Sequence, residues 1–172
     1  PAQVAPAVKQ ATAVTNQNLH ALPVPDMLII SPAQYMQAAR RIAAVHEKAD
    51  SMRVEILTPE EIYNEFSAGT PDPIAYRALA KMLYQSPGRK LKNILFFGPI
   101  YADYRNVSGN GVPHEKDIIA MQEQGERYTY ENRAANDMDY FGSLCDYRSA
   151  LVSMRSKMVE VGVGLIPATS DV

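Results

Sequence analysis

Two runs of consecutive apolar residues constrain the fold of this chain more than any other feature of its sequence. Residues 27–30 read Met-Leu-Ile-Ile, and residues 93–97 read Asn-Ile-Leu-Phe-Phe. A strand with one face in water alternates apolar and polar residues, whereas a strand buried on both faces of a parallel sheet is apolar throughout. Both runs therefore predict buried strands. Residues 54–57, Val-Glu-Ile-Leu, predict a further strand between them.

Helix signals follow the first two predicted strands. The dipeptide Ser31-Pro32 has the pattern of an N-cap followed by proline at the first helical position, which predicts a helix over residues 31–47. Residues 58–61, Thr-Pro-Glu-Glu, have the pattern of a capping box and predict a short helix over residues 59–66. The first of these helices is expected to bury one face, formed by Tyr35, Ala39, Ile42 and Val45.

A third helix is predicted to begin at Asp72-Pro73 and to end at residues 86–88, Ser-Pro-Gly. Its buried stripe is expected to contain Ala75, Leu79, Met82 and Leu83. Strands that alternate with helices in this way are typical of right-handed crossovers between parallel strands. We therefore predict an α/β fold with a doubly wound, mostly parallel sheet flanked by helices, which is a flavodoxin-like half-domain.

In such a sheet, ligands bind outside the carboxyl ends of the strands. The segments expected at this edge are Ser31–Pro32, Thr58, Gly98–Arg105 and Gly164–Thr169. No glycine-rich phosphate loop follows the first strand, because residues 31–34 read Ser-Pro-Ala-Gln. The sequence therefore gives no support to nucleotide binding at this edge.

The two ends of the chain are less regular. Residues 1–25 show no helical or strand period and are expected to be a linker or an extended lead-in, whereas residues 26–172 are expected to form one α/β subdomain. The polar region after the third strand predicts one helix near residues 116–123. Two further strands are predicted near residues 139–144 and 159–163.

Composition excludes several classes of function. The net charge is −2 and the basic residues are scattered, which argues against nucleic acid or an anionic membrane surface as the main partner. No apolar run approaches the ~20 residues that a membrane span requires, so no span is expected. Cys145 is the only cysteine, which excludes a disulfide framework.

Few residues suggest chemistry by themselves. Cys145 with His20, His46 or His114 has no spacing that supports a nucleophile–base pair, so a buried thiol and three unrelated histidines are the simpler interpretation. An acidic group (Asp137, Asp139 and Asp146) could supply oxygen ligands to calcium, although such residues also occur as solvated loop carboxylates. Glu160 precedes a predicted strand, where a carboxylate either orients a catalytic imidazole or is simply a surface residue.

Several segments together resemble the gingipain family of cysteine peptidases. They are Asn-Gln-Asn-Leu-His (residues 16–20), Ile-Tyr-Asn-Glu-Phe-Ser-Ala-Gly-Thr-Pro-Asp-Pro (62–73), Leu-Phe-Phe-Gly (95–98), Asp-Tyr-Phe-Gly (139–142) and Val-Gly-Val-Gly-Leu-Ile-Pro (161–167). The resemblance extends over residues 16–171 and is most specific in residues 62–73. Within the family, it is greatest to the members that act as cell-surface sortases of the type IX secretion system.

The resemblance implies that this chain is the first subdomain of a caspase-like catalytic domain that belongs to a longer protein. The catalytic His and Cys would follow on a second subdomain, so the segment alone should be inactive. Glu160 matches an acidic residue that helps to position the catalytic His, and Asp171 lies near an acid that accepts the substrate side chain. The implied substrate is a polypeptide, no cofactor is implied, and the implied location is secreted or at the bacterial outer-membrane surface.

The sequence also departs from the family pattern at one edge. Pro99 replaces the acid expected after Gly98, Leu165 replaces the arginine of a Gly-Arg-Ile-Pro segment, and Cys145 stands where an acid is more typical. These departures leave open a second interpretation, a degenerate non-catalytic module that binds polypeptide or secretion partners. In either case, the isolated chain is expected to self-associate through the face on which its second subdomain would dock.

Overall fold

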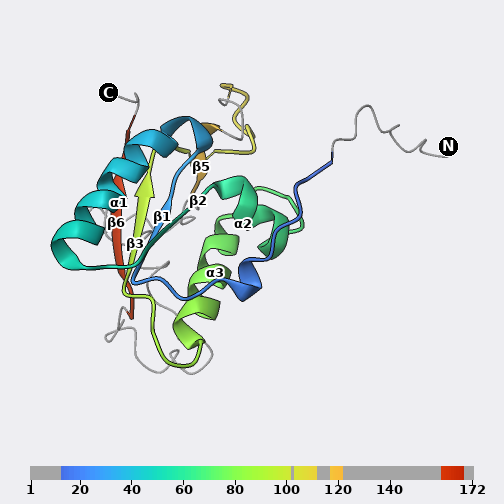
Figure 1. Ribbon diagram of the computed structural model, residues 1–172. Coiled ribbons are helices and arrows are strands. Elements are labelled where there is room, and N and C mark those ends of the chain that lie inside the picture. Colours follow the sequence, from blue (N-terminus) through green and yellow to red (C-terminus); the bar gives the residue numbers. More distant parts are fainter. Residues whose placement is uncertain (1–12, 102, 112–116, 122–159, 169–172) are drawn as a thin grey trace, which may run out of the picture.

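The fold is described by a computed structural model of the chain (Figure 1). The described residues are 13–101, 103–111, 117–121 and 160–168. They form a four-stranded sheet in the order β2-β1-β3-β6 and a separate pair of short strands, β4 and β5. The strands are β1 (Met27–Ile30), β2 (Val54–Leu57), β3 (Asn93–Phe97), β4 (Ile100–Tyr101), β5 (Ile119–Ala120) and β6 (Gly162–Ile166).

The four-stranded sheet is parallel throughout. Met27 of β1 pairs with Val54 of β2 on one side and with Asn93 of β3 on the other, and Asn93 also pairs with Gly162 of β6. The chain moves from β1 to β2 in one direction and then crosses back over β1 to β3. This order is that of flavodoxin-like sheets. The predicted α/β fold with a parallel sheet flanked by helices is confirmed.

The apolar run of β1 is continuous because its two faces belong to two different cores. Met27 and Ile29 pack in a cluster with residues of α1 (Met36–Asp50), whereas Leu28 and Ile30 pack in a second cluster with α2 (Pro59–Phe66) and α3 (Pro73–Gln85). All four side chains are buried. Neither face of β1 therefore has a position for a polar residue.

The predicted start of the first helix is wrong. The chain first makes a 3₁₀ turn, η2 (Ala33–Tyr35), and the α-helix begins at Met36 without a side-chain cap. Ser31 is completely buried, and its backbone N–H donates to Leu57 O at 3.0 Å. Ser31 therefore extends the pairing between β1 and β2 instead of capping a helix.

Helix α1 lies on the sheet through small residues. Ala38, Ala39 and Ala43 are buried, and Ile42 is partly buried against the same cluster. Val45, which was predicted on this face, is instead 61% exposed. An alanine face lets the helix approach β1 and β3 closely, and Val45 lies outside this contact.

The opposite face of the sheet is covered by α2 and α3. The capping box at the start of α2 is confirmed, because Thr58 Oγ1 accepts from Glu61 N at 3.2 Å and Glu61 Oε2 accepts from Thr58 N at 2.8 Å. The predicted cap of α3 is also present, since Asp72 Oδ1 accepts from Ile74 N at 2.9 Å. The buried residues of α3 are Pro73, Ala75, Tyr76, Leu79, Ala80 and Leu83, with Met82 only partly buried.

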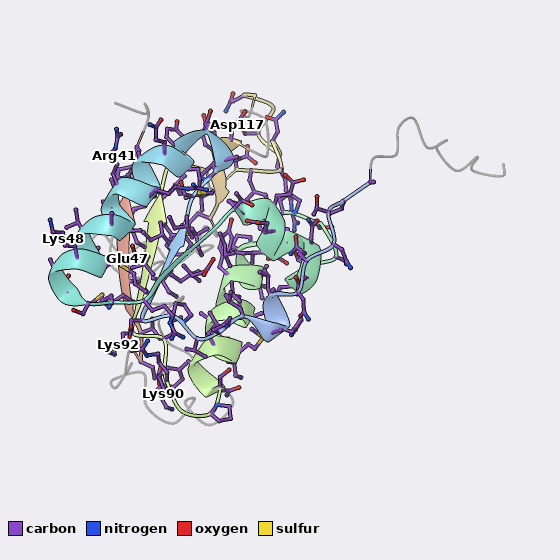
Figure 2. The ribbon with its side chains drawn as sticks, viewed as in Figure 1. Arg41, Glu47, Lys48, Lys90, Lys92 and Asp117 are labelled. Carbon is purple, nitrogen blue, oxygen red and sulfur yellow. The ribbon has the colours of Figure 1, made fainter. Side chains whose placement is uncertain are left out.

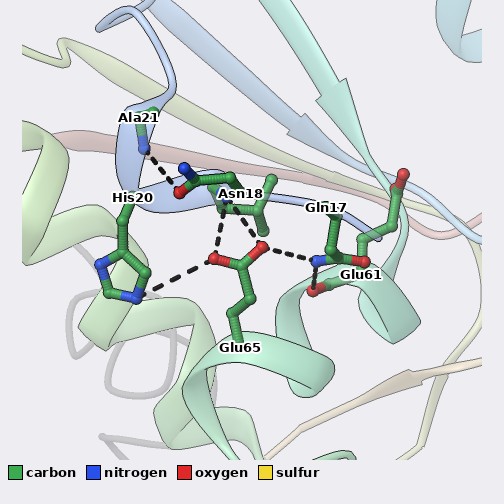
Figure 3. A network of polar contacts seen from close by, with 7 residues as sticks. Gln17, Asn18, His20, Ala21, Glu61 and Glu65 are labelled. Atoms are coloured by element: carbon green, nitrogen blue, oxygen red, sulfur yellow. Dashed lines mark hydrogen bonds and ion pairs between the residues drawn. The ribbon is translucent and has the colours of Figure 1, made fainter. Parts of the chain in front are cut away.

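The described part of the lead-in, residues 13–25, packs against α2 and contains the 3₁₀ turn η1 (Leu19–Ala21) (Figure 3). The backbone N–H of Leu19 donates to both carboxylate oxygens of Glu65, each at 2.8 Å, and Gln17 Nε2 donates to Glu65 Oε1 at 2.9 Å. Leu19 itself is buried in the cluster of α2 and α3. One carboxylate of α2 therefore fixes the path of the chain into the sheet.

Two expectations for the C-terminal half are corrected. The last strand covers residues 162–166 rather than 159–163, so Gly164 lies inside it instead of ending it. Residues 119–120 form β5, paired with β4, where a helix was predicted. The strand predicted near residues 139–144 lies outside the described residues. Among the described helices, none combines the length and the apolar character that crossing a membrane would need.

Candidate functional site

The carboxyl ends of the strands form one continuous edge, as predicted. Backbone hydrogen bonds join neighbouring strands just beyond their ends: Ser31 N donates to Leu57 O, and Gly98 N donates to Ile166 O, each at 3.0 Å. Thr58, at the start of α2, directly follows Leu57. In parallel α/β sheets this edge is where ligands bind, so we call it the carboxyl edge.

The strand order reverses between β1 and β3. At this point of the carboxyl edge, the residues that follow the two strands pack closely against each other. Gly98 follows β3 with a φ of 140°, a conformation that other residues rarely adopt. A Cβ on Gly98 would lie 2.9 Å from Cδ of Pro32, which follows β1. The rings of Tyr35 and Phe97 pack edge to face beside this contact, with centroids 6.4 Å apart. The floor of the carboxyl edge is therefore apolar and tightly packed.

The segment after β3 runs along the carboxyl edge and is held by a second small sheet. Ile119 N donates to Pro99 O at 2.8 Å, and Met121 N donates to Tyr101 O at 2.9 Å. On the other side, Gln34 Nε2 donates to the backbone oxygen of Asp117 at 3.2 Å. Residues 118–121 are all buried. We therefore call residues 118–121 the buried base of the carboxyl edge.

Two buried tyrosines support this base from below. The hydroxyls of Tyr63 (α2) and Tyr76 (α3) contact each other, and both residues lie in one buried cluster with Ala120 of β5. Burial raises the pKa of Tyr63 to about 12 and that of Tyr76 well above its ordinary value. Both phenols are therefore neutral at physiological pH. Sequence analysis missed this pair, although Tyr63 lies within the most specific segment of the resemblance.

Residues 103–111, which we call the edge loop, form an internally bonded loop at the same end of the molecule (Figure 1). The carboxylate of Asp103 accepts from Val107 N at 2.8 Å, from Ser108 N at 3.0 Å and from Ser108 Oγ at 2.5 Å. These hydrogen bonds, first that of the Ser108 hydroxyl, lower the pKa of Asp103. Asn106 Oδ1 accepts from Gly111 N at 2.9 Å.

Glu160 lies at the other end of the sheet from the carboxyl edge. It precedes Gly162, which pairs with the first residue of β3, Asn93. Gly162 and Ile166 are the two ends of β6, four strand positions or roughly 13 Å apart, and Glu160 lies in a bend before Gly162. Glu160 therefore does not reach the carboxyl edge. The other predicted site residues, Asp137, Asp139, Asp146 and Asp171, lie outside the described residues.

The two described histidines are also away from the carboxyl edge. His46 Nδ1 is 2.8 Å from Asp50 Oδ2 at the end of α1, and this pair lines a groove of about 390 Å³ with Asn93 and Gly162. His20 stacks on Phe66 at the end of α2 with ring centroids 5.0 Å apart. His114 and Cys145 lie outside the described residues. Within the described part of the chain, no three His, Cys, Asp or Glu side chains are grouped to hold a metal ion.

A buried carboxylate marks the opposite, amino edge of the sheet. Asp26 is 3% exposed; its Oδ2 accepts from Arg53 N at 2.9 Å and lies 3.3 Å from Arg89 Nη1. Lys92 Nζ is 3.1 Å from Oδ1, near enough for an ion pair but not aligned for a hydrogen bond. Figure 2 places Lys92 and Lys90 at this end and Asp117 at the other. This cluster joins β1 to its two neighbours and is structural.

The fold and its edge thus define a parallel α/β protein with a flavodoxin-like strand order and a packed carboxyl edge. Comparison with family profiles identifies it more narrowly: the profile of peptidase family C25 matches residues 20–171. The chain belongs to peptidase family C25. This result confirms the resemblance to gingipains inferred from residues 62–73 and the other segments.

Among solved structures, the chain is similar to dimeric latent PorU from Porphyromonas gingivalis. The two are 28% identical, with a TM-score of 0.71 over 92% of this chain. The matched region is only 15% of the PorU chain, so this sequence spans a small part of the length of that protein. No curated protein matches the sequence significantly.

Proposed function

We propose that this chain is the scaffold and substrate-cleft half of a gingipain-like cysteine endopeptidase or sortase, whose catalytic His and Cys lie beyond residue 172. The observation that carries the proposal is the match to peptidase family C25 over residues 20–171, in a fold whose carboxyl edge is already formed. The thiolate of the complete enzyme would attack a peptide carbonyl with His as base. Water or an amine would then resolve the acyl-enzyme.

In this proposal, residues 26–172 are the first subdomain, and the second subdomain of the same protein is its main partner. The polypeptide substrate would lie along the carboxyl edge, with Asp171 contributing to the pocket for its side chain. The similarity to PorU and the resemblance to type IX sortases support a secreted or outer-membrane surface location. A calcium site at Asp137, Asp139 and Asp146 remains part of the proposal.

The place of Glu160 restricts the role that the resemblance implies for it. At the amino edge, Glu160 can orient a catalytic histidine only if that histidine comes to the same edge. In the full-length protein, a Glu160→Gln variant with a lowered kcat and a shifted pH profile would support the positioning role. An unchanged pH profile would leave Glu160 as a structural residue.

The proposal is tested on the longest natural polypeptide that contains this sequence. We expect it to cleave or transfer members of a fluorogenic peptide panel, to lose activity on alkylation by iodoacetamide, and to contain a His and a Cys after residue 172. Cys145→Ser should keep the activity, because Cys145 is not the proposed nucleophile. The 172-residue chain alone should be inactive. Loss of activity in Cys145→Ser, or cleavage by the isolated chain, would contradict the proposal.

A second candidate is a non-catalytic polypeptide-binding module, which is favoured by the substitutions at the carboxyl edge. Pro99 stands where the family has an acid. Among the described backbone hydrogen bonds, its carbonyl accepts one, from Ile119 N. Leu165 replaces the arginine of the family and is 39% exposed. A full-length protein that binds peptides without cleaving any of them would favour this candidate.

A further inference from the structure

The edge loop has a fixed conformation that its own side chains enforce. Asp103 uses both carboxylate oxygens to hold the backbone of Val107 and Ser108. Asn106 adopts a left-handed conformation with a φ of 53°, which is uncommon outside glycine, and its side chain holds Gly111. A second amide, Asn110 Nδ2, donates to Ser108 Oγ at 3.1 Å. The loop therefore loses little further conformational freedom when a partner binds.

The loop also follows directly from a rigid support. The strands β4 and β5 join its start to the buried base at residues 118–121, and Tyr63 and Tyr76 lie in the same buried cluster as Ala120 of that base. Loss of the contact between the two hydroxyls would leave a buried polar group unpaired, so this contact fixes how α2 and α3 pack beneath β5. The edge loop is thereby held in one place beside the carboxyl edge.

The fixed loop presents an apolar side chain and a cation to solvent. Val107 is 85% exposed, the largest value among the exposed large hydrophobic residues described. The guanidinium of Arg105 lies 5.3 Å from the ring centroid of Tyr104. The only acidic side chain of the loop, Asp103, is occupied by backbone and hydroxyl donors within the loop. Asp103 stays ionised, but its oxygens are turned to these donors, so Arg105 is the charged group of the loop that is available to a partner.

We propose that the edge loop is a recognition element that binds an extended polypeptide in which an acidic residue lies next to an apolar residue. Val107 would contact the apolar side chain, and the planar guanidinium of Arg105 would bind the carboxylate through paired hydrogen bonds. The choice of a polypeptide as partner rests on the proposed function. Preorganised loops on a rigid scaffold are where binding residues concentrate, which is the physical reason for assigning this role here.

The test is photo-crosslinking, which needs binding but no catalysis. p-Benzoylphenylalanine is placed at position 107, or at the exposed Val45 of α1 as control, in the full-length protein. A mixture of biotinylated random-sequence nonapeptides is the probe. We expect at least about tenfold more peptide to be captured at position 107 than at position 45, equivalent to a modest binding preference. Equal capture at the two positions would overturn the proposal.

The charge preference is tested on the captured peptides. Asp and Glu should be enriched about two- to fivefold, the range that an exposed ion pair supports. Arg105→Gln should abolish this enrichment, whereas Arg41→Gln on the exposed surface of α1 should preserve it. Enrichment that survives Arg105→Gln would overturn the assignment of Arg105. Cleavage of peptides without capture at position 107 would leave the proposed function intact and reject the recognition role of the edge loop. Capture at position 107 without cleavage would support that role and reject the proposed peptidase activity.

Discussion

Among single residues, Gly98 occupies a position of the carboxyl edge where the backbone conformation and the close packing exclude any side chain. Its φ of 140° is strained for any other residue, and a Cβ there would meet Pro32 Cδ at 2.9 Å. Gly98→Ala should therefore destabilise the fold by about 1–3 kcal/mol, measured by urea unfolding. Gly164→Ala is the control, because its Cβ would meet Leu95 Cδ1 at an ordinary 3.5 Å. Equal stability of the two variants would contradict this account.

Asp26 makes a pH-dependent contribution to stability. The backbone hydrogen bond from Arg53 lowers its pKa against the opposing effect of burial, and Lys92 and Arg89 lower it further. A carboxyl group with a lowered folded-state pKa stabilises the fold above its unfolded value, near 3.8, and loses this effect as the pH falls through the lower folded value. The stabilisation is therefore complete at pH 7, begins to decline near pH 3.8 and is lost below the lower pKa of the folded state.

Asp26→Asn should accordingly destabilise the protein by about 1–3 kcal/mol at pH 7, because two cations lose their buried partner. The difference from wild type should shrink as the pH falls below 3.8. Urea unfolding at several pH values measures both effects. Asp50→Asn is the control, since the side chain of Asp50 is 48% exposed and its pair with His46 should contribute less than about 1 kcal/mol. A pH-independent effect of Asp26→Asn would contradict the electrostatic explanation.

Among the elements, α2, like α3, starts where the sequence predicted, and its cap was predicted in detail. The capping box is a local pattern, and both of its hydrogen bonds form between Thr58 and Glu61. Thr58→Ala should cost about 1 kcal/mol of stability, in the range of 0.5–2 kcal/mol for lost caps. Thr58→Ser should restore most of this loss, because serine caps equally well. If Thr58→Ser were as unstable as Thr58→Ala, packing of the threonine methyl group would be the cause instead.

The contact between the lead-in and α2 depends on Glu65. Both of its oxygens accept from the Leu19 amide, and its pKa is lowered by these hydrogen bonds even though burial opposes the shift. Glu65→Ala should speed hydrogen exchange of the Leu19 amide by about tenfold or more, since a hydrogen bond to a charged group contributes about 1.5–3 kcal/mol. Glu47→Ala, on the exposed surface of α1, should leave this rate unchanged. Unchanged exchange in Glu65→Ala would show that Leu19 is held by apolar packing alone.

The errors of sequence interpretation at this scale have a common physical cause. Ser31 looked like a helix cap, but it continues the strand pairing with β2, and the chain then makes the 3₁₀ turn η2 before the α-helix begins at Met36. Residues 119–120 looked helical, but pairing with β4 and burial over Tyr63 and Tyr76 make them a strand. Local sequence patterns predicted the helix caps, whose hydrogen bonds are made between residues close in sequence. The strand pairing at Ser31 and β5 and the contact between Tyr63 and Tyr76 join segments distant in sequence, so local patterns did not predict them.

For the whole molecule, the sheet and its carboxyl edge could be predicted, whereas the exact bounds of the last strand could not. Continuous apolar runs predict parallel strands, and parallel strands predict a shared edge. The register of β6, however, is set by its pairing with β3, so a shift of three residues changed which segments lie at each end. Because of this shift, Gly164 lies inside the strand and only the residues after Ile166 lie beyond its carboxyl end.

The state of the isolated chain follows from the far side of β6. Among the described residues, β6 pairs only with β3, and its Leu165 and Ile166 are 39% and 44% exposed. An unpaired strand with apolar side chains is a template for association. The 172-residue chain should therefore dimerise or aggregate in light scattering at high concentration. Leu165→Lys should return it to the monomer, because lysine on an edge strand opposes pairing, whereas Val45→Lys on the exposed surface of α1 should not. A wild-type monomer at high concentration would mean that the chain needs no second subdomain to cover this face, and would weaken the half-domain proposal itself.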